Sequence, residues 1–209
     1  MKTEKLMILL EGNIGAGKTT VGRAIAASGL YGFIEEPTRA WREKFASNML
    51  ENLYRDPARW AFTFQICTFI TRAKSWPEIA ALTNHRRVIL ERSIFCDRFV
   101  FVENFYRIGL MTPAEYQLYC GLWEFMTSRY LDQPDMIIYL RTPSEVCLER
   151  IKARGREEER GISLEYLLQL ERLHDEWLLH SSDPCVLVLN GERRWSTDEV
   201  LAVIEEHCR

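Results

Sequence analysis

A glycine-rich stretch near the N-terminus has the residue types and spacing that bind phosphate. Residues 12–19 read Gly-Asn-Ile-Gly-Ala-Gly-Lys-Thr and fit the pattern G-x-x-x-x-G-K-[ST] in full. Glycines let such a loop turn its amide N–H groups toward one point, where a following helix adds partial positive charge. Lys18 would reach the β- and γ-phosphates of ATP or GTP, and the Thr19 hydroxyl would bind Mg²⁺. The alternative is a turn that only caps a helix. The predicted nucleotide-binding residues are Gly12, Asn13, Ile14, Gly15, Ala16, Gly17, Lys18, Thr19 and Thr20.

Charged residues directly follow two apolar runs, at the points where strands would end. Glu35 and Glu36 follow the run at 32–34, and Arg92 lies just beyond the run at 87–90. Ligands of α/β sheets bind beyond the carboxyl ends of the strands. A carboxylate there can take the proton of an acceptor hydroxyl, and a guanidinium can offset charge on a transferring phosphoryl group. We expect Glu36 and Arg92 to do this, with a structural ion pair as the alternative, and we expect Glu35 to be a solvated loop charge.

A second cationic segment lies late in the chain, at about 150–161. Its five cations include Arg150, Arg154 and Arg156, and they surround three acids. Arg150 and Arg154 are four residues apart and share a helix face, while Gly155 can act as a breaker or hinge. A basic lid that closes over phosphates needs this composition, whereas the alternative is a solvated helix face. With the phosphate-binding loop upstream, the composition favours the lid.

Apolar runs alternate with helical patterns, which predicts an α/β fold. Five buried-strand candidates lie at 6–10, 32–34, 87–90, 136–140 and 186–189. Helical stretches are expected from Lys18, over 57–82, over 112–131, over 143–153 and over 163–180. The strand candidates are continuous rather than alternating runs, as in a parallel sheet covered on both faces. We therefore expect a five-stranded parallel sheet flanked by helices, in one domain over residues 1–209 with a lid at about 150–161.

Composition excludes several classes of protein. The 209 residues are 47% hydrophobic and 27% charged, which is too apolar for a disordered chain, and no apolar run is long enough to span a membrane. A net charge of −3 disfavours a nucleic-acid partner. The six widely spaced cysteines suggest reduced thiols. The N-terminal residues resemble neither a signal nor a transit peptide, so we expect a cytoplasmic protein, although a chain trimmed of a mitochondrial peptide would look the same.

Taken together, these segments resemble the deoxyribonucleoside kinases, and within them the deoxycytidine and deoxyguanosine kinase branch. The resemblance runs in order along nearly the whole chain. Its motifs are Glu11–Thr19, Glu36-Pro37 followed by Trp41, Tyr54-x-Asp56-Pro57-x-x-Trp60, Phe64-Gln65, Glu91–Phe95, Phe101–Asn104, Ile138–Arg141, Arg154–Gly161 and Trp177–His180. The resemblance implies transfer of the γ-phosphoryl group of ATP to the 5′-hydroxyl of a deoxynucleoside, with Mg²⁺, in a homodimer built through helices that begin near Tyr54 and Thr112.

The resemblance also implies roles for individual residues. Glu36 would activate the 5′-hydroxyl, Arg92 would bind that hydroxyl and the transition state, and Glu91 would lie near Mg²⁺ with Thr19. Gln65 would bind the edge of the base. Phe64, Phe101 and Trp41 would form the walls on which the base stacks, and Tyr54 and Glu159 would bind the 3′-hydroxyl. Arg154 and Arg156 would bind the phosphates, and Arg150 would lie by the adenine. The alternatives are ordinary core aromatics and a satisfied buried amide.

Two positions bear on which base is bound. Arg72 lies two helical turns after Gln65, and Asp97 follows Glu91 by six residues. An Arg–Asp pair resembles the deoxycytidine and deoxyguanosine kinases, in which it can hydrogen-bond purine groups and narrows the space for a thymine methyl. We therefore expect deoxyguanosine, deoxyadenosine or deoxycytidine to be favoured over thymidine. Thr68 departs from the Ala or Ser expected there, which leaves the ranking among these three open.

Two other functions fit parts of the sequence. Asp97-Arg98-Phe99 resembles a motif of nucleoside monophosphate kinases of the thymidylate kinase type. Such an enzyme would need cations for the phosphate of its acceptor, and it would have little use for a carboxylate base. A nucleotide-sensing protein without turnover is the second alternative. Glu36 beside Arg92 favours a kinase with a neutral hydroxyl acceptor over both of these alternatives.

Overall fold

The computed structural model describes residues 6–43, 45–82, 85–180 and 185–207. The N-terminal residues Met1–Lys5, on which the expectation about targeting peptides depends, and Cys208, one of the six cysteines, lie outside the described residues. The other five cysteines are free thiols. No helix in the described part of the chain is both long enough and apolar enough to cross a bilayer.

A five-stranded, all-parallel sheet forms the centre of the fold, which confirms the predicted class. Its strands run in the spatial order β2-β3-β1-β4-β5, and each apolar run of the sequence supplies one of them. The strands are β1 (Leu6–Glu11), β2 (Tyr31–Ile34), β3 (Arg87–Glu91), β4 (Met136–Arg141) and β5 (Val186–Asn190). Strand β1 lies in the middle, paired with β3 on one side and β4 on the other. The loop that follows β1 therefore leaves from the centre of the sheet edge.

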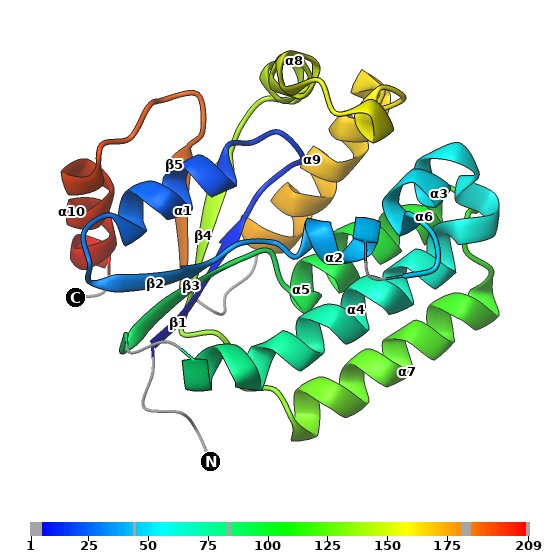
Figure 1. Ribbon diagram of the computed structural model, residues 1–209, viewed down its shortest axis with the longest axis horizontal. Helices are drawn as coiled ribbons and strands as arrows, with labels where there is room; N and C mark the ends of the chain where they lie inside the picture. The colour runs from blue at the N-terminus through cyan, green and yellow to red at the C-terminus, as the bar shows by residue number, and fades with distance from the viewer. Residues whose placement is uncertain (1–5, 44, 83–84, 181–184, 208–209) are drawn as a thin grey trace.

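Helices cover both faces of the sheet (Figure 1). Alternate residues of β1 pack on opposite sides, with Ile8 and Leu10 in one core cluster and Met7 and Leu9 in another. The first cluster is closed by α1 (Lys18–Ala26), α8 (Ser144–Arg154) and α10 (Thr197–His207), and the second by α3 (Met49–Arg55), α4 (Pro57–Leu82) and α7 (Pro113–Arg129). Helix α9 (Leu164–Leu178) contributes residues to both clusters. Because both faces of β1 are covered, its sequence is a continuous apolar run.

The predicted helices form close to the expected positions because their end signals are local. Thr112 caps α7 in a capping box with Glu115, and Pro113 is the first helical residue. Gly155 ends α8 with φ 69°, a left-handed conformation that glycine adopts without strain. These capping residues are therefore local signals that predict the helix ends without knowledge of tertiary contacts.

Several short helices were not predicted from the sequence. They are α2 (Thr38–Glu43), α5 (Ile94–Cys96), a π-helical turn η1 (Asp97–Val102), α6 (Glu103–Arg107) and a 3₁₀ turn η2 (Glu157–Glu159). The helices α3 and α10 were also missed. The segments of seven residues or fewer carry fewer than two helical turns, so their formation depends on packing rather than on periodicity. Helix α10 has 11 residues, with Val200 and Ile204 buried four residues apart, so its periodic signal was present in the sequence and was missed.

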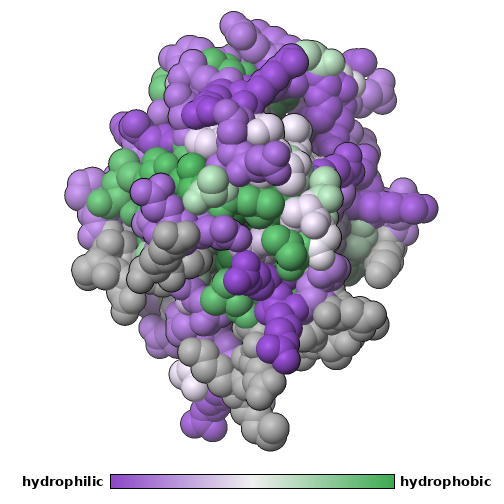
Figure 2. All heavy atoms as spheres, turned by 90° about the vertical axis from the view of Figure 1, so that its left-hand side faces the viewer, coloured by the Kyte–Doolittle hydropathy of each residue, from purple (hydrophilic) through white to green (hydrophobic). Residues whose placement is uncertain are grey.

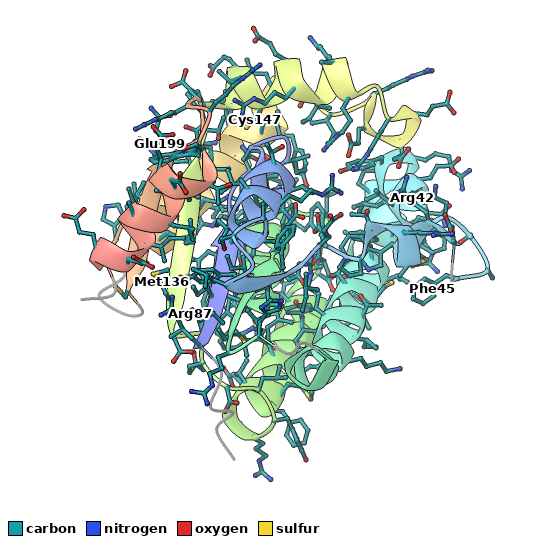
Figure 3. The ribbon with its side chains drawn as sticks, turned by 60° about the vertical axis from the view of Figure 1, so that its left-hand side comes forward. Arg42, Phe45, Arg87, Met136, Cys147 and Glu199 are labelled. Atoms are coloured by element: carbon teal, nitrogen blue, oxygen red, sulfur yellow. The ribbon has the colours of Figure 1, made fainter. Side chains whose placement is uncertain are left out.

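The carboxyl ends of the strands meet at one edge of the sheet, together with α8. In Figure 3, Arg87 and Met136, the first residues of β3 and β4, lie low in the molecule, whereas Cys147 of α8 lies at the top. The face at the left of Figure 1 is shown in Figure 2, where hydrophobic side chains gather in the middle and hydrophilic ones surround them. The chemistry predicted from the sequence therefore gathers at the opposite end of the strands from Arg87 and Met136.

Strand β1 ends in a carboxylate that has no exposed surface. Glu11 is 0% exposed and accepts a hydrogen bond of 2.5 Å from the Ser93 hydroxyl. Its second oxygen, Oε2, has no hydrogen-bond partner among the residues that the structure describes. Burial raises the pKa of Glu11 to about 7, although the Ser93 hydrogen bond and the charge of Arg92 act to lower it. The folded protein therefore holds a proton on Glu11 at a pH where the unfolded chain has lost it.

We expect Glu11→Gln to stabilise the protein selectively at alkaline pH. Because the folded pKa is raised, folding binds a proton between about pH 4.5 and 7, and the free energy of unfolding falls as the pH rises through this range. The neutral amide avoids this loss, so the variant should gain about 2 kcal/mol relative to wild type between pH 5 and pH 8.5. Urea unfolding of the nucleotide-free protein at both pH values measures this difference in unfolding free energy. The control is Glu192→Gln, at an exposed glutamate. An equal difference at the two pH values would contradict the assignment.

Candidate active site

A cavity of about 490 Å³ opens where β1, β2 and β3 end. It brings together side chains from the glycine-rich loop, the ends of β2 and β3, the helices α2 to α4 and the lid segment. The predicted site residues that line it are Ile14, Gly15, Gly17, Lys18, Thr19, Thr20, Glu36, Trp41, Tyr54, Phe64, Gln65, Arg72, Glu91, Arg92, Asp97, Phe101, Arg150, Arg154, Arg156 and Glu159. Of the predicted site residues, Gly12, Asn13 and Ala16 do not line this cavity.

The loop residues outside the cavity shape the loop instead. The Asn13 side-chain amide donates to the Leu167 carbonyl at 2.9 Å, which anchors the loop to α9. A Cβ atom at Gly12 would lie 2.6 Å from the Leu140 carbonyl oxygen, and Gly12 has φ 149°. Ala16 is 0% exposed and its carbonyl accepts from Arg150 at 2.8 Å. These three residues therefore hold the backbone in a curve from which the amides of their neighbours can point outward.

The Lys18 ammonium is tied to the loop itself. It donates to the carbonyl oxygens of Gly12 at 3.0 Å and Asn13 at 2.8 Å. Burial lowers the pKa of Lys18 to about 8. A partly desolvated cation on this loop is strongly attracted to phosphate, because little water screens it.

An oxygen pair suited to a divalent cation lies beside the loop. The Thr19 hydroxyl donates to Glu91 Oε1 at 2.7 Å. Thr19 is the second residue of α1, and Glu91 is the last residue of β3. Hydroxyl and carboxylate oxygens are ligands that Mg²⁺ accepts, usually with phosphate oxygens completing the shell. The donor set at this point therefore fits Mg²⁺.

Glu36 is held between two buried arginines. Its Oε1 atom lies 2.6 Å from Arg72 Nη2 and 3.1 Å from Arg92 Nε. Burial acts to raise the pKa of Glu36, but the charges of Arg92 and Arg72 outweigh it and lower the pKa to about 2. The carboxylate is consequently ionised at every physiological pH. Glu36 and Arg92 thus form the ion pair that was the alternative interpretation, and both residues also line the cavity, where the predicted catalytic roles would place them.

Arg92 has an unusual backbone. It is the only non-glycine residue with positive φ in the described chain, at 65°. Its guanidinium carbon lies 4.8 Å from the centre of the Phe101 ring. A non-glycine residue in this conformation costs of order 1–3 kcal/mol, a strain found mainly at functional sites. The strained backbone turns the side chain of Arg92 back toward Glu36 and the cavity.

Two aromatic rings and a buried amide line one part of the cavity. Trp41 and Phe64 are in edge-to-face contact, with ring centres 5.6 Å apart. Both rings line the cavity and also belong to the buried core, and their role as walls for a base stays a prediction. Gln65 is 2% exposed, and the Thr68 hydroxyl lies 3.4 Å from its Oε1 atom. An amide fixed in this way offers one donor and one acceptor to a planar ligand.

The predicted Arg72–Asp97 pair is formed. Arg72 Nε lies 2.9 Å from Asp97 Oδ2, and both side chains are buried. Asp97 begins the π-helical turn η1, whose wider winding also brings Phe101 to the cavity. Arg72 therefore joins Asp97 to Glu36, so the residues expected to recognise the base are connected to those expected to act on the hydroxyl.

The cationic segment contacts the cavity and not only solvent. Arg154 lies 2.7 Å and Arg156 3.2 Å from the buried carboxylate of Glu159. A second contact joins Glu158 to Arg42 of α2, at 3.5 Å. The segment thus lines the cavity and is joined to α2 by an ion pair, so it is not only a solvated helix face. Its role as a lid stays a prediction.

Some lining residues were not identified from the sequence. Tyr166 of α9 is one, and apolar Leu50 and Leu53 of α3 are others. Their spacing matches that of core residues, and no sequence signal distinguishes them. Glu35, expected to be solvated, is ion-paired with Arg23 at 2.7 Å with half of its side chain exposed.

Comparison with known proteins identifies the group to which this site belongs. The family described as deoxynucleoside kinase matches residues 8–209. A fowlpox virus protein named probable deoxycytidine kinase is 37% identical over 189 residues, covering 88% of this chain and 78% of that protein. Human mitochondrial thymidine kinase 2 is 36% identical over 183 residues, covering 87% and 67%. Mouse deoxycytidine kinase is 35% identical over 197 residues, covering 83% and 75%.

These similarities agree with the geometry of the cavity. The matched region contains the glycine-rich loop, the ends of β2 and β3 and the lid, so no part of the site lies outside it. Neither a nucleoside monophosphate kinase nor a passive nucleotide sensor appears among these relatives. The chain belongs to the deoxynucleoside kinase family and is an ATP-dependent deoxynucleoside kinase.

Proposed function

We propose that this kinase binds the 5′-hydroxyl of a deoxynucleoside between Glu36 and Arg92, opposite the glycine-rich loop that holds the triphosphate of ATP. The observation that carries the proposal is the ionised Glu36 carboxylate, held by two arginines inside the cavity that the loop also lines. An uncharged hydroxyl can donate a hydrogen bond to such a carboxylate. The acceptor oxygen and the γ-phosphorus would then face each other, which is the main requirement of phosphoryl transfer.

The low pKa of Glu36 indicates when the proton moves. A carboxylate with a pKa of about 2 is a weak base toward a free alcohol. In a loose transition state the hydroxyl becomes acidic only after the bond to phosphorus has begun to form, so the proton is transferred late. Glu36 therefore first orients the hydroxyl and then accepts its proton. Arg92 offsets the charge that develops on the phosphoryl oxygens.

The proposal assigns the remaining groups around ATP. Thr19 and Glu91 would hold Mg²⁺, which when bound neutralises charge on the β- and γ-phosphates. Arg154 and Arg156 would exchange Glu159 for phosphate oxygens when the lid closes, and Arg150 would lie by the adenine. Glu159, freed from the arginines, could then accept a hydrogen bond from the 3′-hydroxyl together with Tyr54. The ion pairs of Glu159 with Arg154 and Arg156 support this assignment only in that they hold the three side chains together at the cavity.

We propose deoxycytidine, deoxyadenosine and deoxyguanosine as better substrates than thymidine. The relatives include both deoxycytidine and thymidine kinases, so the preference is argued from the pocket. Arg72 and Asp97 place a charged pair beside Gln65, where a thymine methyl group would have to be buried against it. Burying an apolar group against a charged pair gains nothing from its transfer out of water and displaces polar contacts.

We further propose a homodimer formed through α4 and α7. Helix α7 packs its Tyr119 against Phe69 of α4, with ring centres 5.7 Å apart. On exposed surface α7 also carries Leu118, at 64% exposed, and Phe125, at 47% exposed. Apolar residues on the outer face of a helix indicate a protein contact when they recur along it. The net charge of −3 and the free cysteines support a partner that is not nucleic acid and a reducing, cytoplasmic location.

Replacing the carboxylate tests the central assignment. Glu36→Ala should lower kcat by about 10²- to 10⁴-fold while ATP binding stays within a few-fold of wild type. Steady-state kinetics and ATP titration measure the two effects. Glu43→Ala, which removes an exposed carboxylate of α2, is the matched control. Near-normal turnover by the Glu36 variant would rule out its role at the hydroxyl.

The base preference is tested by replacing the charged pair. The double variant Arg72→Met with Asp97→Ala should raise the ratio of kcat/KM for thymidine to that for deoxycytidine by about tenfold or more. Arg72 also contacts Glu36, so overall kcat will fall, and the ratio between substrates is the measurement to use. A ratio equal to that of wild type would show that the pair does not read the base.

The proposed dimer has a direct test. Sedimentation of the wild type should give a mass of two 24.6 kDa chains, and Leu118→Glu should shift it to one. Leu168→Glu, at an exposed leucine of α9, should leave the mass unchanged. A wild-type protein that sediments as a single chain would contradict the proposal.

A further inference from the structure

Two buried groups that the proposed chemistry does not use lie behind Arg92. Arg92 Nη1 donates to Cys96 Sγ at 3.4 Å. Cys96 Sγ in turn lies 3.6 Å from Nε2 of His174, a residue of α9. Cys96 and His174 are both 0% exposed. A thiol and an imidazole are thus lined up behind the guanidinium that faces the cavity.

The contacts of His174 fix the direction of these hydrogen bonds. Its Nδ1 atom lies 2.7 Å from the Leu170 carbonyl oxygen, which can only accept. Nδ1 therefore carries the ring proton, and Nε2 presents a lone pair. The Cys96 thiol donates to that lone pair. This leaves the lone pairs of the sulfur to accept from Arg92.

The surroundings keep every member of this chain in the required protonation state. Burial raises the pKa of the Cys96 thiol well above its usual value, so the sulfur keeps its proton. Burial also lowers the pKa of His174 to about 3, with the charge of Arg92 acting in the same direction. The imidazole further stacks on Tyr139, with ring planes 6° apart. The ring can neither gain a second proton near neutral pH nor turn freely.

We infer that Cys96 and His174 are positioning residues for phosphoryl transfer, which hold the Arg92 guanidinium at the reacting hydroxyl through a directional chain that ends at the Leu170 carbonyl. The inference rests on the proposed role of Arg92. Glu36 restrains only the Nε side of the guanidinium, and Phe101 only its face. The sulfur restrains Nη1 and completes the fixation. A charge fixed before the reaction stabilises the transition state without having to reorganise.

The experiment compares the effects on kcat and on KM in variants of the two residues of the hydrogen-bonded chain. Cys96→Ala and His174→Leu should each lower kcat about tenfold, with KM for ATP and for the deoxynucleoside within about threefold of wild type. The double variant should lose no more than either single variant, since breaking one link disconnects the chain. Cys96→Ser, whose hydroxyl can donate and accept, should restore kcat to within about threefold of wild type.

Controls separate positioning from folding. Cys67→Ala removes another buried thiol from the core and should leave kcat per folded molecule unchanged. The folded fraction is measured by thermal unfolding for every variant. If His174→Leu does not fold, Cys96→Ala and Cys96→Ser still test whether the side chain at position 96 positions Arg92. Wild-type kcat in folded Cys96→Ala, strictly additive losses, or no rescue by serine would each overturn the inference.

Two further measurements distinguish failure of this inference from failure of the proposed function. Arg92→Lys should reduce kcat far more than Cys96→Ala does. If Arg92→Lys is fully active, the proposed role of Arg92 is wrong. If Arg92→Lys loses activity but Cys96→Ala does not, only the positioning role of Cys96 and His174 is wrong. Nitrogen-15 NMR of the wild type at pH 7 should show a neutral His174 protonated on Nδ1. A His174 protonated on Nε2 would contradict the proposed direction of these hydrogen bonds, independently of any activity measurement.

Discussion

The contact between one carboxylate and two guanidinium groups organises this enzyme. Glu36, Arg72 and Arg92 come from three different elements, and each would be costly to bury alone. Together they neutralise part of their charge and leave hydrogen-bonding capacity directed into the cavity. Asp97, which pairs with Arg72, brings these buried charges into balance, so removing any one of the three leaves an uncompensated buried charge. The ends of β2 and β3 and the middle of α4 must consequently stay in one relative position.

The sheet supplies that fixed position. Strand β3 lies between β2 and β1, so the three strand ends that carry Glu36, Arg92 and the glycine-rich loop are neighbours. Both faces of the sheet are packed with apolar side chains, which makes its edge rigid. The strand ends that lead into the glycine-rich loop and Arg92 are therefore one strand spacing apart, and the cationic segment that follows α8 also lines the cavity. The site thus depends on the rigid edge of the sheet.

The sequence predicted the sheet and the site more completely than it predicted the helices between them. Continuous apolar runs and a loop of defined spacing are local signals, and they located all five strands and the residues after them. The short helices α2, α3 and α5 gave no periodic signal, because they are stabilised by the site that they surround. Leu50, Leu53 and Tyr166 are ordinary residues by type, so only the folded chain shows that they line the cavity. The roles of Cys96 and His174 depend on distances between α5 and α9, which no pattern encodes.

The π-helical turn η1 has a consequence for how this chain tolerates change in length. Its winding holds one residue more per turn than an α-helix would need, between Asp97 at one end and the α-helical Glu103 that follows it. Deleting a single residue here would let the backbone relax into a regular helix. Because the π-helical turn absorbs one extra residue, removing that residue would leave the helix downstream in phase, while the side chains within the turn, including Phe101, would take new directions around the axis. Shortening this segment would therefore move Phe101 relative to Arg92 while making the helix itself more regular.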